Sequence, residues 1–380
     1  MRLLFSPVSS TGFQKTSDGR TYIYDNSRSG FLQRAEYVSY FSGEQVNGGI
    51  YKGELAFCSS ILDSVVVFVC ALLFMPLLFI HSLFKLDKAP YATLFKEILE
   101  TINLVKICRK NNINTIFWFS IYEKDSNLGT LILQNYGIQI NKIPSEVPLA
   151  IWNKIIIADK LCVCMGYQFD EIEFYKDSIF VNEFDLWGPE RVLDNIGKYS
   201  VAVPVHKHTI GFYSTGAWIR KLENHADQGL DMVAMEESVK QTVKKFCIKN
   251  TAYKFIVFLH PRERSPKYLE RTLKKYQDDF SGVDYEILDA SLNSSNSFEC
   301  VDLAVAFQST IVYERLYYGF KTLLMPIGSK SFPVEKSTIE NICAFNEETL
   351  FEKITTNSGL TNTEFFKKNR INHLAKFLYN

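Results

Sequence analysis

The second half of the chain alternates short apolar runs with longer amphipathic stretches. Between the apolar runs, hydrophobic positions repeat every three to four residues, which predicts helices at 231–249, 266–276 and 309–318. The apolar runs predict buried strands at 209–216, 253–259, 283–288, 301–307 and 322–325. Because strands and helices alternate throughout, this half predicts a doubly wound α/β domain with a parallel sheet.

The first half carries a less regular form of the same pattern. Apolar runs predict strands at 114–120, 138–143 and 161–165, and we read the first five residues as an opening strand. Helical spacing predicts helices at 91–111, 127–136 and 148–159, and another beginning at 188. Turns are expected at 17–20 and 47–49. The chain is therefore expected to form two Rossmann-like domains, residues 1–205 and residues 206–380.

Residues 61–84 are the most hydrophobic part of the chain. The segment is apolar on all sides and approaches the roughly 20 residues that cross a bilayer, although Asp63 lies near one end and Pro76 would kink a helix. Three interpretations stay open: a transmembrane anchor, a kinked helix that enters one leaflet, and a buried helix of the domain. Lys85 and Lys88 favour a cytoplasmic position for that flank. We expect a membrane-associated helix in the N-terminal half.

Composition restricts the partners of the chain. The 42 Lys and Arg balance the 42 Asp and Glu, which argues against bulk electrostatic attraction to nucleic acid. The 8 cysteines are irregularly spaced. The closest pair, Cys162 and Cys164, has no further ligands at a spacing that suits zinc, so reduced, structural cysteines are expected.

Three predicted strands of the second half end in residues suited to a nucleotide, and ligands of open α/β sheets bind at the carboxyl ends of strands. The first of these strands runs into Ser214, Thr215 and Gly216. Backbone N–H groups in such a small-residue turn can approach a phosphate. An ordinary strand-to-helix turn is the alternative.

The second strand ends in His260, Pro261 and Arg262. An imidazole held by a following proline can donate to a phosphate or to a ribose hydroxyl. Arg262 and Arg264 add charge-assisted donors that suit phosphates. The alternative is a loop histidine beside solvated arginines.

The third strand delivers Ser309 and Thr310 to the first turn of a helix. Hydroxyl and N–H groups at a helix N-terminus bind anions, and Glu314, one turn further on, can accept from sugar hydroxyls. Simple N-capping by Ser309 is the alternative. The three strand ends together predict a donor-nucleotide site more specifically than any one alone.

These residues resemble a known family. The order of His260-Pro261, then Asp302 with Ser309-Thr310 and Glu314 at fixed spacing, then Gly-Phe-Lys-Thr-Leu-Leu-Met at 319–325, is similar to the C-terminal domain of bacterial GT-B-type glycosyltransferases of surface polysaccharide assembly. Among these, the motifs resemble those of the sialyltransferase and Kdo-transferase-like enzymes. The resemblance covers residues 209–325. It implies a GT-B-like fold of two Rossmann-like domains, with His260, Ser309 and Thr310 on the nucleotide phosphate or ribose.

The resemblance also implies a function. A glycosyltransferase of this kind would move a sugar, such as a CMP-linked nonulosonic or Kdo-type acid, to a capsule or lipopolysaccharide glycan at the cytoplasmic face of the bacterial inner membrane. The nucleotide-sugar is a substrate, so no cofactor is expected. No Asp-x-Asp motif follows a predicted strand, so we expect a metal-independent, inverting transfer. The alternatives are a CDP-polyol phosphotransferase and a non-catalytic, membrane-tethered scaffold.

An inverting transfer needs a group that takes the proton of the acceptor hydroxyl. In enzymes of this kind that base often lies on the N-terminal domain. Glu123 and Asp125, just beyond the strand predicted at 114–120, are the first candidates. Glu183 and Asp185 are the second. An ordinary loop carboxylate is the alternative for each of them.

Overall fold

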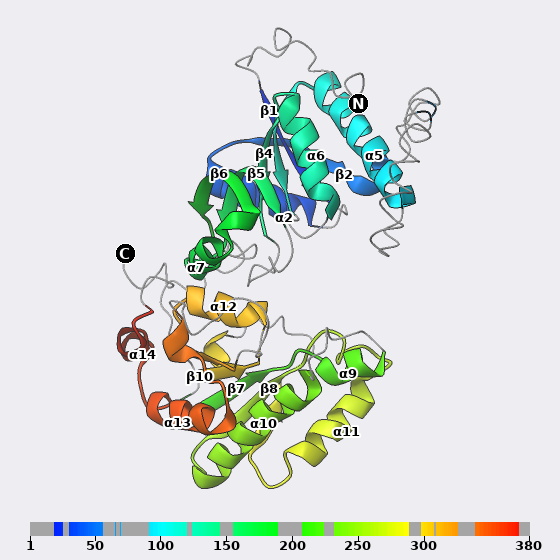
Figure 1. Cartoon of the computed structure of the whole chain (residues 1–380). Coiled ribbons are helices and arrows are strands. Elements are labelled where there is room, and N and C mark those ends of the chain that lie inside the picture. The colour runs from blue at the N-terminus through cyan, green and yellow to red at the C-terminus, as the bar shows by residue number, and fades with distance from the viewer. Residues whose placement is uncertain are drawn as a thin grey trace. The chain divides into compact units, whose positions relative to one another are not determined.

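The computed structural model describes residues 19–25, 30–55, 65, 69, 91–119, 124–144, 155–188, 207–223, 232–288, 298–307, 309–325 and 339–371. The chain divides into two compact α/β units (Figure 1). The first unit comprises residues 1–145, 149–164 and 175–190, and the second comprises 146–148, 165–174 and 191–380. The predicted domain boundary, between residues 205 and 206, lies outside the described residues and stays a prediction.

The first unit contains a six-stranded parallel sheet in the order β2-β1-β3-β4-β5-β6. Its strands are β1 Arg20–Asp25, β2 Val46–Tyr51, β3 Ile113–Trp118, β4 Gln139–Lys142, β5 Ile156–Val163 and β6 Ile179–Leu186. Its helices are α2 Phe31–Ser42, α3 Lys52–Leu55, α5 Tyr91–Lys110 and α6 Lys124–Asn135.

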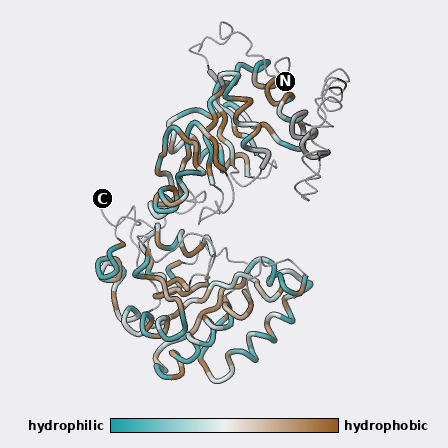
Figure 2. Tube along the Cα trace, in the orientation of Figure 1, coloured by the Kyte–Doolittle hydropathy of each residue, from teal (hydrophilic) through white to brown (hydrophobic). Residues whose placement is uncertain are grey.

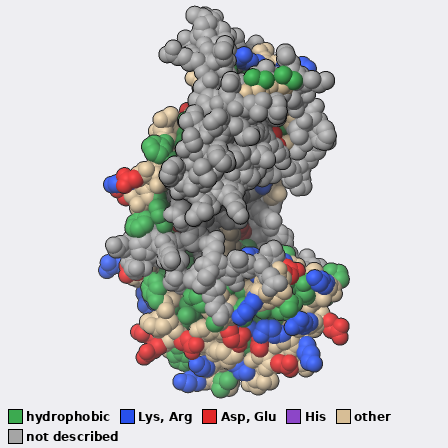
Figure 3. Space-filling model, turned by 45° about the vertical axis from the view of Figure 1, so that its right-hand side comes forward, with side chains coloured by type: hydrophobic (Ala, Val, Ile, Leu, Met, Phe, Trp, Pro, Cys, Tyr) green, Lys and Arg blue, Asp and Glu red, His purple; other side chains and the backbone are tan. Residues whose placement is uncertain are grey.

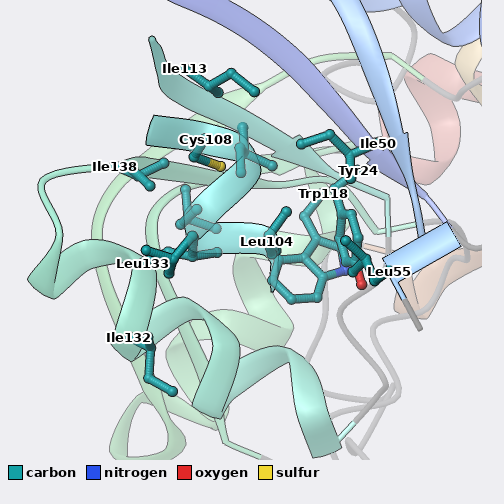
Figure 4. Packing of buried hydrophobic residues seen from close by; sticks show 13 residues of the cluster. Tyr24, Ile50, Leu55, Leu104, Cys108, Ile113, Trp118, Ile132, Leu133 and Ile138 are labelled. Carbon is teal, nitrogen blue, oxygen red and sulfur yellow. The ribbon is translucent and has the colours of Figure 1, made fainter. Parts of the chain in front are cut away.

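The core of the first unit lies between the sheet and helices α5 and α6 (Figure 4). Leu104 of α5, Leu133 of α6 and Ile116 of β3 are fully buried. Trp118 meets Tyr24 edge-on, with ring centroids 4.5 Å apart. Burying one such side chain stabilises the fold by roughly 1.5–3 kcal/mol. Figure 2 shows the matching concentration of hydrophobic residues along the central strands.

The second unit contains a five-stranded parallel sheet in the order β11-β10-β7-β8-β9. Its strands are β7 Thr209–Tyr213, β8 Lys254–Phe258, β9 Tyr285–Ile287, β10 Leu303–Ala306 and β11 Thr322–Leu324. Its helices are α7 Tyr167–Phe174, α9 Ala217–Leu222, α10 Met232–Lys249, α11 Leu269–Asp279, α12 Thr310–Tyr317, α13 Glu347–Asn357 and α14 Asn362–Asn369. The earliest strand, β7, is central, and the strand order reverses between β7 and β10, as in a doubly wound sheet.

Most of the predicted elements are confirmed. The predicted strands and helices of the second half correspond to β7–β11 and to α10, α11 and α12, with boundaries shifted by one to three residues. In the first half, α5, α6, β3 and β4 lie where the pattern predicts them, and Gly137 ends α6 with a φ of +76°.

Two predicted elements are wrong. The turn expected at 47–49 lies inside β2, where a Cβ at Gly48 would come within 2.7 Å of the Tyr22 ring, so the glycines let aromatic rings pack over the strand. The helix expected at 148–159 is contradicted from Ile156 onward, because Ile156 and Ile157 already belong to β5. β-Branched residues favour strands, and β5 pairs with β6 along its length.

Several elements were not predicted from the sequence pattern: β1, α2, β2, α3, α7 and the edge strand β6 in the first half, and α9, α13 and α14 in the second. Helix α7 belongs to the second unit, where Tyr167 stacks on Tyr313 of α12 with ring centroids 5.5 Å apart. In sequence, α7 lies between two segments of the first unit. Local periodicity therefore gave no indication that it packs on the second unit.

The predicted opening strand and nearly all of the apolar segment at 61–84 lie outside the described residues. Among the helices that the structure does describe, none is both long and apolar enough to span a bilayer. The membrane-associated helix therefore stays a prediction.

A buried guanidinium connects helix α12 to the segments that precede β10 and β11 in the second unit. Arg315 of α12 is fully buried and donates to the carbonyl oxygens of Phe298 at 2.7 Å, Val301 at 3.3 Å and Lys321 at 3.4 Å. Carbonyl oxygens, rather than a carboxylate, thus accept from this cation. They belong to the segment before β10 and to the residue before β11, so one side chain links α12 to two strands.

Replacing Arg315 by Ala should destabilise the second unit. The change leaves a cavity and removes the donor from three buried carbonyl groups, which together cost about 3 kcal/mol or more. Urea unfolding of Arg315→Ala and of the exposed control Lys274→Ala measures the difference. A loss below about 1 kcal/mol would show that the interior reorganises around the missing side chain.

Candidate functional site

The three strands that carry the predicted nucleotide residues are neighbours in the second sheet. Strand β7 lies between β8 and β10, and all three run parallel. The ends that carry Ser214, His260 and Ser309 are therefore at one edge of the sheet, next to the point where the strand order reverses. Open α/β sheets bind ligands at this point.

The turn after β7 is closed by a buried carboxylate that the sequence analysis did not single out. Glu236 of α10 accepts from the backbone N–H of Thr215 at 2.6 Å and of Ala217 at 3.2 Å, and from the hydroxyl of Ser214 at 3.1 Å. The N–H of Gly216 donates to the Ser214 hydroxyl at 3.0 Å. The sequence analysis expected the N–H groups of this turn to approach a phosphate. In this structure they donate to Glu236 and Ser214 instead.

Gly216 brings the first turn against the second strand end. It adopts a left-handed conformation with φ +66°, and a Cβ at this position would lie 3.0 Å from Nδ1 of His260. Glycine is thus required by the backbone and by the imidazole that packs on it. The residues of the first predicted element hold His260 in place.

The imidazole of His260 is a neutral hydrogen-bond donor. Nδ1 accepts from the backbone N–H of Arg262 at 3.2 Å, so the proton of the neutral ring is on Nε2. Burial, together with the positive charges of Arg220, Arg262 and Arg264, lowers the pKa of His260 to about 4. Nε2 can therefore donate at neutral pH without a change of charge.

A second buried carboxylate, that of Glu263, accepts a hydrogen bond from the backbone of His260. Glu263 accepts from the backbone N–H of His260 at 2.9 Å, from Nε1 of Trp218 at 2.8 Å and from the hydroxyl of Tyr276 at 3.3 Å. Burial raises the pKa of Glu263. Burial, and then the charge of Glu263, raise the pKa of Glu236 to about 7. Two interacting carboxylates thus lie beneath the strand ends.

Three arginines surround His260, and they differ in their partners. Arg262 forms an ion pair with Glu223 at 3.0 Å, and Nε of Arg264 donates to the Leu259 carbonyl oxygen at 2.9 Å. Among the described residues, the side chain of Arg220 has neither a hydrogen bond nor an ion pair, and its Nε is buried. Of the three arginines, Arg220 is therefore the one whose guanidinium could bind an anion without first breaking a described contact. The sequence analysis favoured Arg262 instead.

The third strand end places two hydroxyls at the start of α12. Ser309 is the N-cap residue with extended backbone (φ −157°), yet its side chain caps no N–H group of the helix. Ser309, Thr310 and Glu314 are all half-buried. Simple N-capping, the alternative for Ser309, does not describe this geometry.

Two other residues of the quoted motif have a structural role. Lys321 and Asp302 form a buried ion pair with a distance of 2.9 Å between Nζ and Oδ1. Nζ of Lys321 also donates to the Ser358 carbonyl oxygen at 3.2 Å. This part of the motif holds β10, β11 and the C-terminal helices together.

The predicted carboxylates of the first unit are only partly described. Glu123 and the side chain of Asp125, a residue of the first turn of α6, lie outside the described residues. Glu183 and Asp185 lie within strand β6 rather than in a loop. Lys160 lies 3.1 Å from Glu183 and 3.9 Å from Asp185, so both second candidates take part in a surface ion-pair cluster.

A buried lysine marks the carboxyl edge of the first sheet. Lys142, the last residue of β4, is fully buried and donates from Nζ to Oδ1 of Asn127 at 3.0 Å. Burial lowers the pKa of Lys142 to about 7. Asp25 and Arg34, which form an ion pair, are near the end of β1 in the same sheet.

The sequence contains a signal for two of the missed residues. Glu236 precedes Val239 and Val243 by three and seven residues, which puts a carboxylate on the apolar stripe of α10. Lys142 follows Ile140 by two residues and shares its face of β4. A charge on an apolar face is expensive unless it has partners, so both positions were detectable. For Arg220 no such pattern exists.

Comparisons with known proteins identify the fold. No protein-family model matches the chain, and no curated protein matches it. The crystal structure of MurG from Acinetobacter baumannii covers 94% of this chain and 97% of its own, at 12% identity and a TM-score of 0.50. UDP-GlcNAc 2-epimerase from Neisseria meningitidis, bound to UDP-GlcNAc, covers 93% and 94%, at 10% identity and 0.51. MnaA of S. aureus, solved with UDP, covers 94% and 93%, at 10% identity and 0.53.

These similarities extend over both units and are all at low sequence identity. They show that the chain has the GT-B type of fold, with two parallel-sheet α/β domains, as the sequence analysis predicted. Because one fold carries many activities, the similarity does not select a reaction.

The pair of buried carboxylates should make stability depend on pH. The pKa of Glu236 rises from 4.5 to about 7 on folding, so the folded chain holds this proton more tightly than the unfolded chain. The free energy of unfolding contributed by this group is therefore fully present below about pH 4.5 and is lost as pH rises through about 7.

Replacing Glu236 by Gln removes the titrating group and keeps a side chain of similar shape. Urea unfolding midpoints between about pH 5 and pH 8 should fall less steeply for Glu236→Gln than for the unaltered chain. Glu348→Gln, which removes an exposed carboxylate of α13, should leave the profile unchanged. Parallel profiles for all three proteins would contradict the protonation assigned to Glu236.

Proposed function

We propose that this protein is a glycosyltransferase that takes a sugar from a nucleotide-sugar donor. The observation that carries the proposal is that His260, Ser309 and Thr310 all follow strands at the carboxyl edge of the second sheet, with the charge of Arg220 acting on His260. A neutral imidazole donor, a guanidinium that has no side-chain partner among the described residues, and two hydroxyls are suited to the phosphates and ribose of a nucleotide.

In the proposed reaction these groups stabilise the leaving nucleotide. Negative charge develops on its phosphate as the bond to the sugar breaks, and fixed donors in a partly buried site stabilise that charge without reorganising. Nε2 of His260 and the guanidinium of Arg220 supply the donors. Arg262 contributes only if its ion pair with Glu223 opens.

We also propose the chemical class of the donor and of the acceptor. The resemblance of the motifs at His260-Pro261 and Ser309-Thr310 supports a CMP-linked nonulosonic or Kdo-type acid and a capsule or lipopolysaccharide glycan, transferred at the cytoplasmic face of the bacterial inner membrane. We propose an inverting, metal-independent transfer in which Glu123 or Asp125 takes the acceptor proton.

The fold neighbours broaden the donors that must be compared. One of them is a UDP-GlcNAc 2-epimerase solved with UDP-GlcNAc, and another, MnaA, was solved with UDP. An epimerase would convert UDP-GlcNAc without an acceptor, whereas a transferase needs one. Incubation with the sugar nucleotide alone, followed by analysis of the sugar, separates these two activities.

Thermal-shift titrations with CMP-, CDP-, UDP- and GDP-linked sugars should identify one nucleotide that stabilises the chain. For that nucleotide we expect His260→Ala, Arg220→Ala and the double change Ser309→Ala with Thr310→Ala each to weaken binding by about tenfold, because each removes a donor to the bound nucleotide. Lys274→Ala is the surface control.

Three outcomes would contradict the proposal. If no nucleotide stabilises the chain, the scaffold alternative is favoured. If a nucleotide binds equally well to His260→Ala and Arg220→Ala, the protein binds nucleotides at another place. A product formed from a CDP-polyol would instead establish the phosphotransferase.

A further inference from the structure

A concave surface lies on the second unit, and its lining contains none of the residues of the proposed nucleotide site. It is a pocket of about 530 Å³ on the second unit, within the usual range of small-molecule sites. Three short stretches of α9, α10 and α11 line it. The lining residues are Trp218, Lys221, Leu222, Val233, Arg271 and Lys275.

Helix α9 separates this pocket from the nucleotide site. Residues three and four apart share one face of a helix, so Trp218, Lys221 and Leu222 form one side of α9. Arg220 lies on the other side and contributes to the field around His260. The two sites therefore use different faces of the same short helix.

The pocket has a positive charge and an aromatic wall. Its lining includes two lysines and an arginine and no carboxylate. The guanidinium of Arg271 lies over the Trp218 ring, 5.5 Å from the centroid. Lys275 is partly neutralised by Asp279 at 2.9 Å, whereas Arg271 has no ion pair among the described residues. Arg271 is thus the lining cation that has no carboxylate partner among the described residues, and Lys221 adds a second positive charge to the lining.

The indole of Trp218 is held in a fixed orientation. Its Nε1 donates to Glu263 at 2.8 Å, and the other oxygen of Glu263 accepts from the backbone N–H of His260. One buried carboxylate therefore positions both the pocket wall and the proposed donor histidine. Helices α9 and α11 lie on the right-hand side of the second unit in Figure 1, and Figure 3 brings this side forward. Lys and Arg side chains form a band across it.

We infer that this pocket binds an acidic saccharide, through Lys221, Arg271 and the face of Trp218. Guanidinium and ammonium groups suit carboxylates. A fixed indole, with Leu222 and Val233 beside it, suits the apolar face of a sugar ring. A ligand that carries both a carboxylate and a flat ring satisfies the whole lining. The further identification of this saccharide as the growing acceptor glycan rests on the proposed function.

The test is isothermal titration of the full chain with three probes of equal length: an oligomer of sialic acid, an oligomer of galacturonic acid and a neutral dextran oligomer. We expect the acidic oligomers to bind, more weakly as salt rises, and the neutral oligomer to bind at least about tenfold more weakly. Arg271→Glu and Lys221→Glu should each reduce binding of the acidic probes by about tenfold or more.

Lys274→Glu is the matched control, because it makes the same charge reversal on α11 at a residue outside the lining. Arg271→Gln, which removes the charge without reversing it, should give an intermediate loss. The inference is overturned if the acidic oligomers bind Arg271→Glu and the unaltered chain equally. It is also overturned if phosphatidylglycerol vesicles bind in an Arg271-dependent way and the acidic oligomers do not, since the pocket would then recognise a lipid surface.

Nucleotide binding measured on the same variants separates this inference from the proposed function. Arg271→Glu should keep the nucleotide affinity of the unaltered chain. Lost glycan binding with intact nucleotide binding supports two sites. An unaltered chain that binds acidic oligomers and no nucleotide would overturn the proposed function and leave the pocket assignment in place.

Discussion

The carboxylate of Glu236 fills the turn that follows β7, and the arrangement of the whole strand edge depends on it. It accepts from two backbone N–H groups and from the Ser214 hydroxyl. The turn can therefore remain tight and place Gly216 against His260. Burying a carboxylate is costly unless hydrogen bonds compensate for the lost water, and the turn supplies those bonds.

This constraint decides where an anion can bind. Since the N–H groups of the β7 turn are occupied, the phosphate site that we propose at this edge uses the neighbouring groups: Nε2 of His260, the guanidinium of Arg220 and the hydroxyls at the start of α12. The neutral imidazole donates without carrying a charge, and Arg220 supplies the positive charge. Glu263 connects this arrangement to the pocket on the other side of α9.

Local pattern predicted most of the second sheet, because β7, β8, β10 and β11 are buried on both faces and the helices carry clear apolar stripes. The errors came from contacts between distant residues. Gly48 and Gly49 looked like a turn, but their missing side chains accommodate the rings of Tyr22 and Phe31. Helix α7 packs on α12, more than a hundred residues away in sequence.

The same limit applies to the site. His260, Ser309 and Thr310 stand at strand ends and were predictable from the order of elements. Glu236 was detectable as a carboxylate on the apolar stripe of α10, although its partners in the β7 turn were not. Arg220 left no pattern, because what surrounds it follows from how α9 packs against the strand ends. The central claim is that a nucleotide binds beside His260 and not in the turn that Glu236 closes. A crystal structure with the stabilising nucleotide tests it most directly. We predict phosphate oxygens within hydrogen-bond distance of His260 Nε2 and the Arg220 guanidinium. Phosphate bound to the N–H groups of Thr215 and Ala217, with Glu236 displaced, would contradict the account.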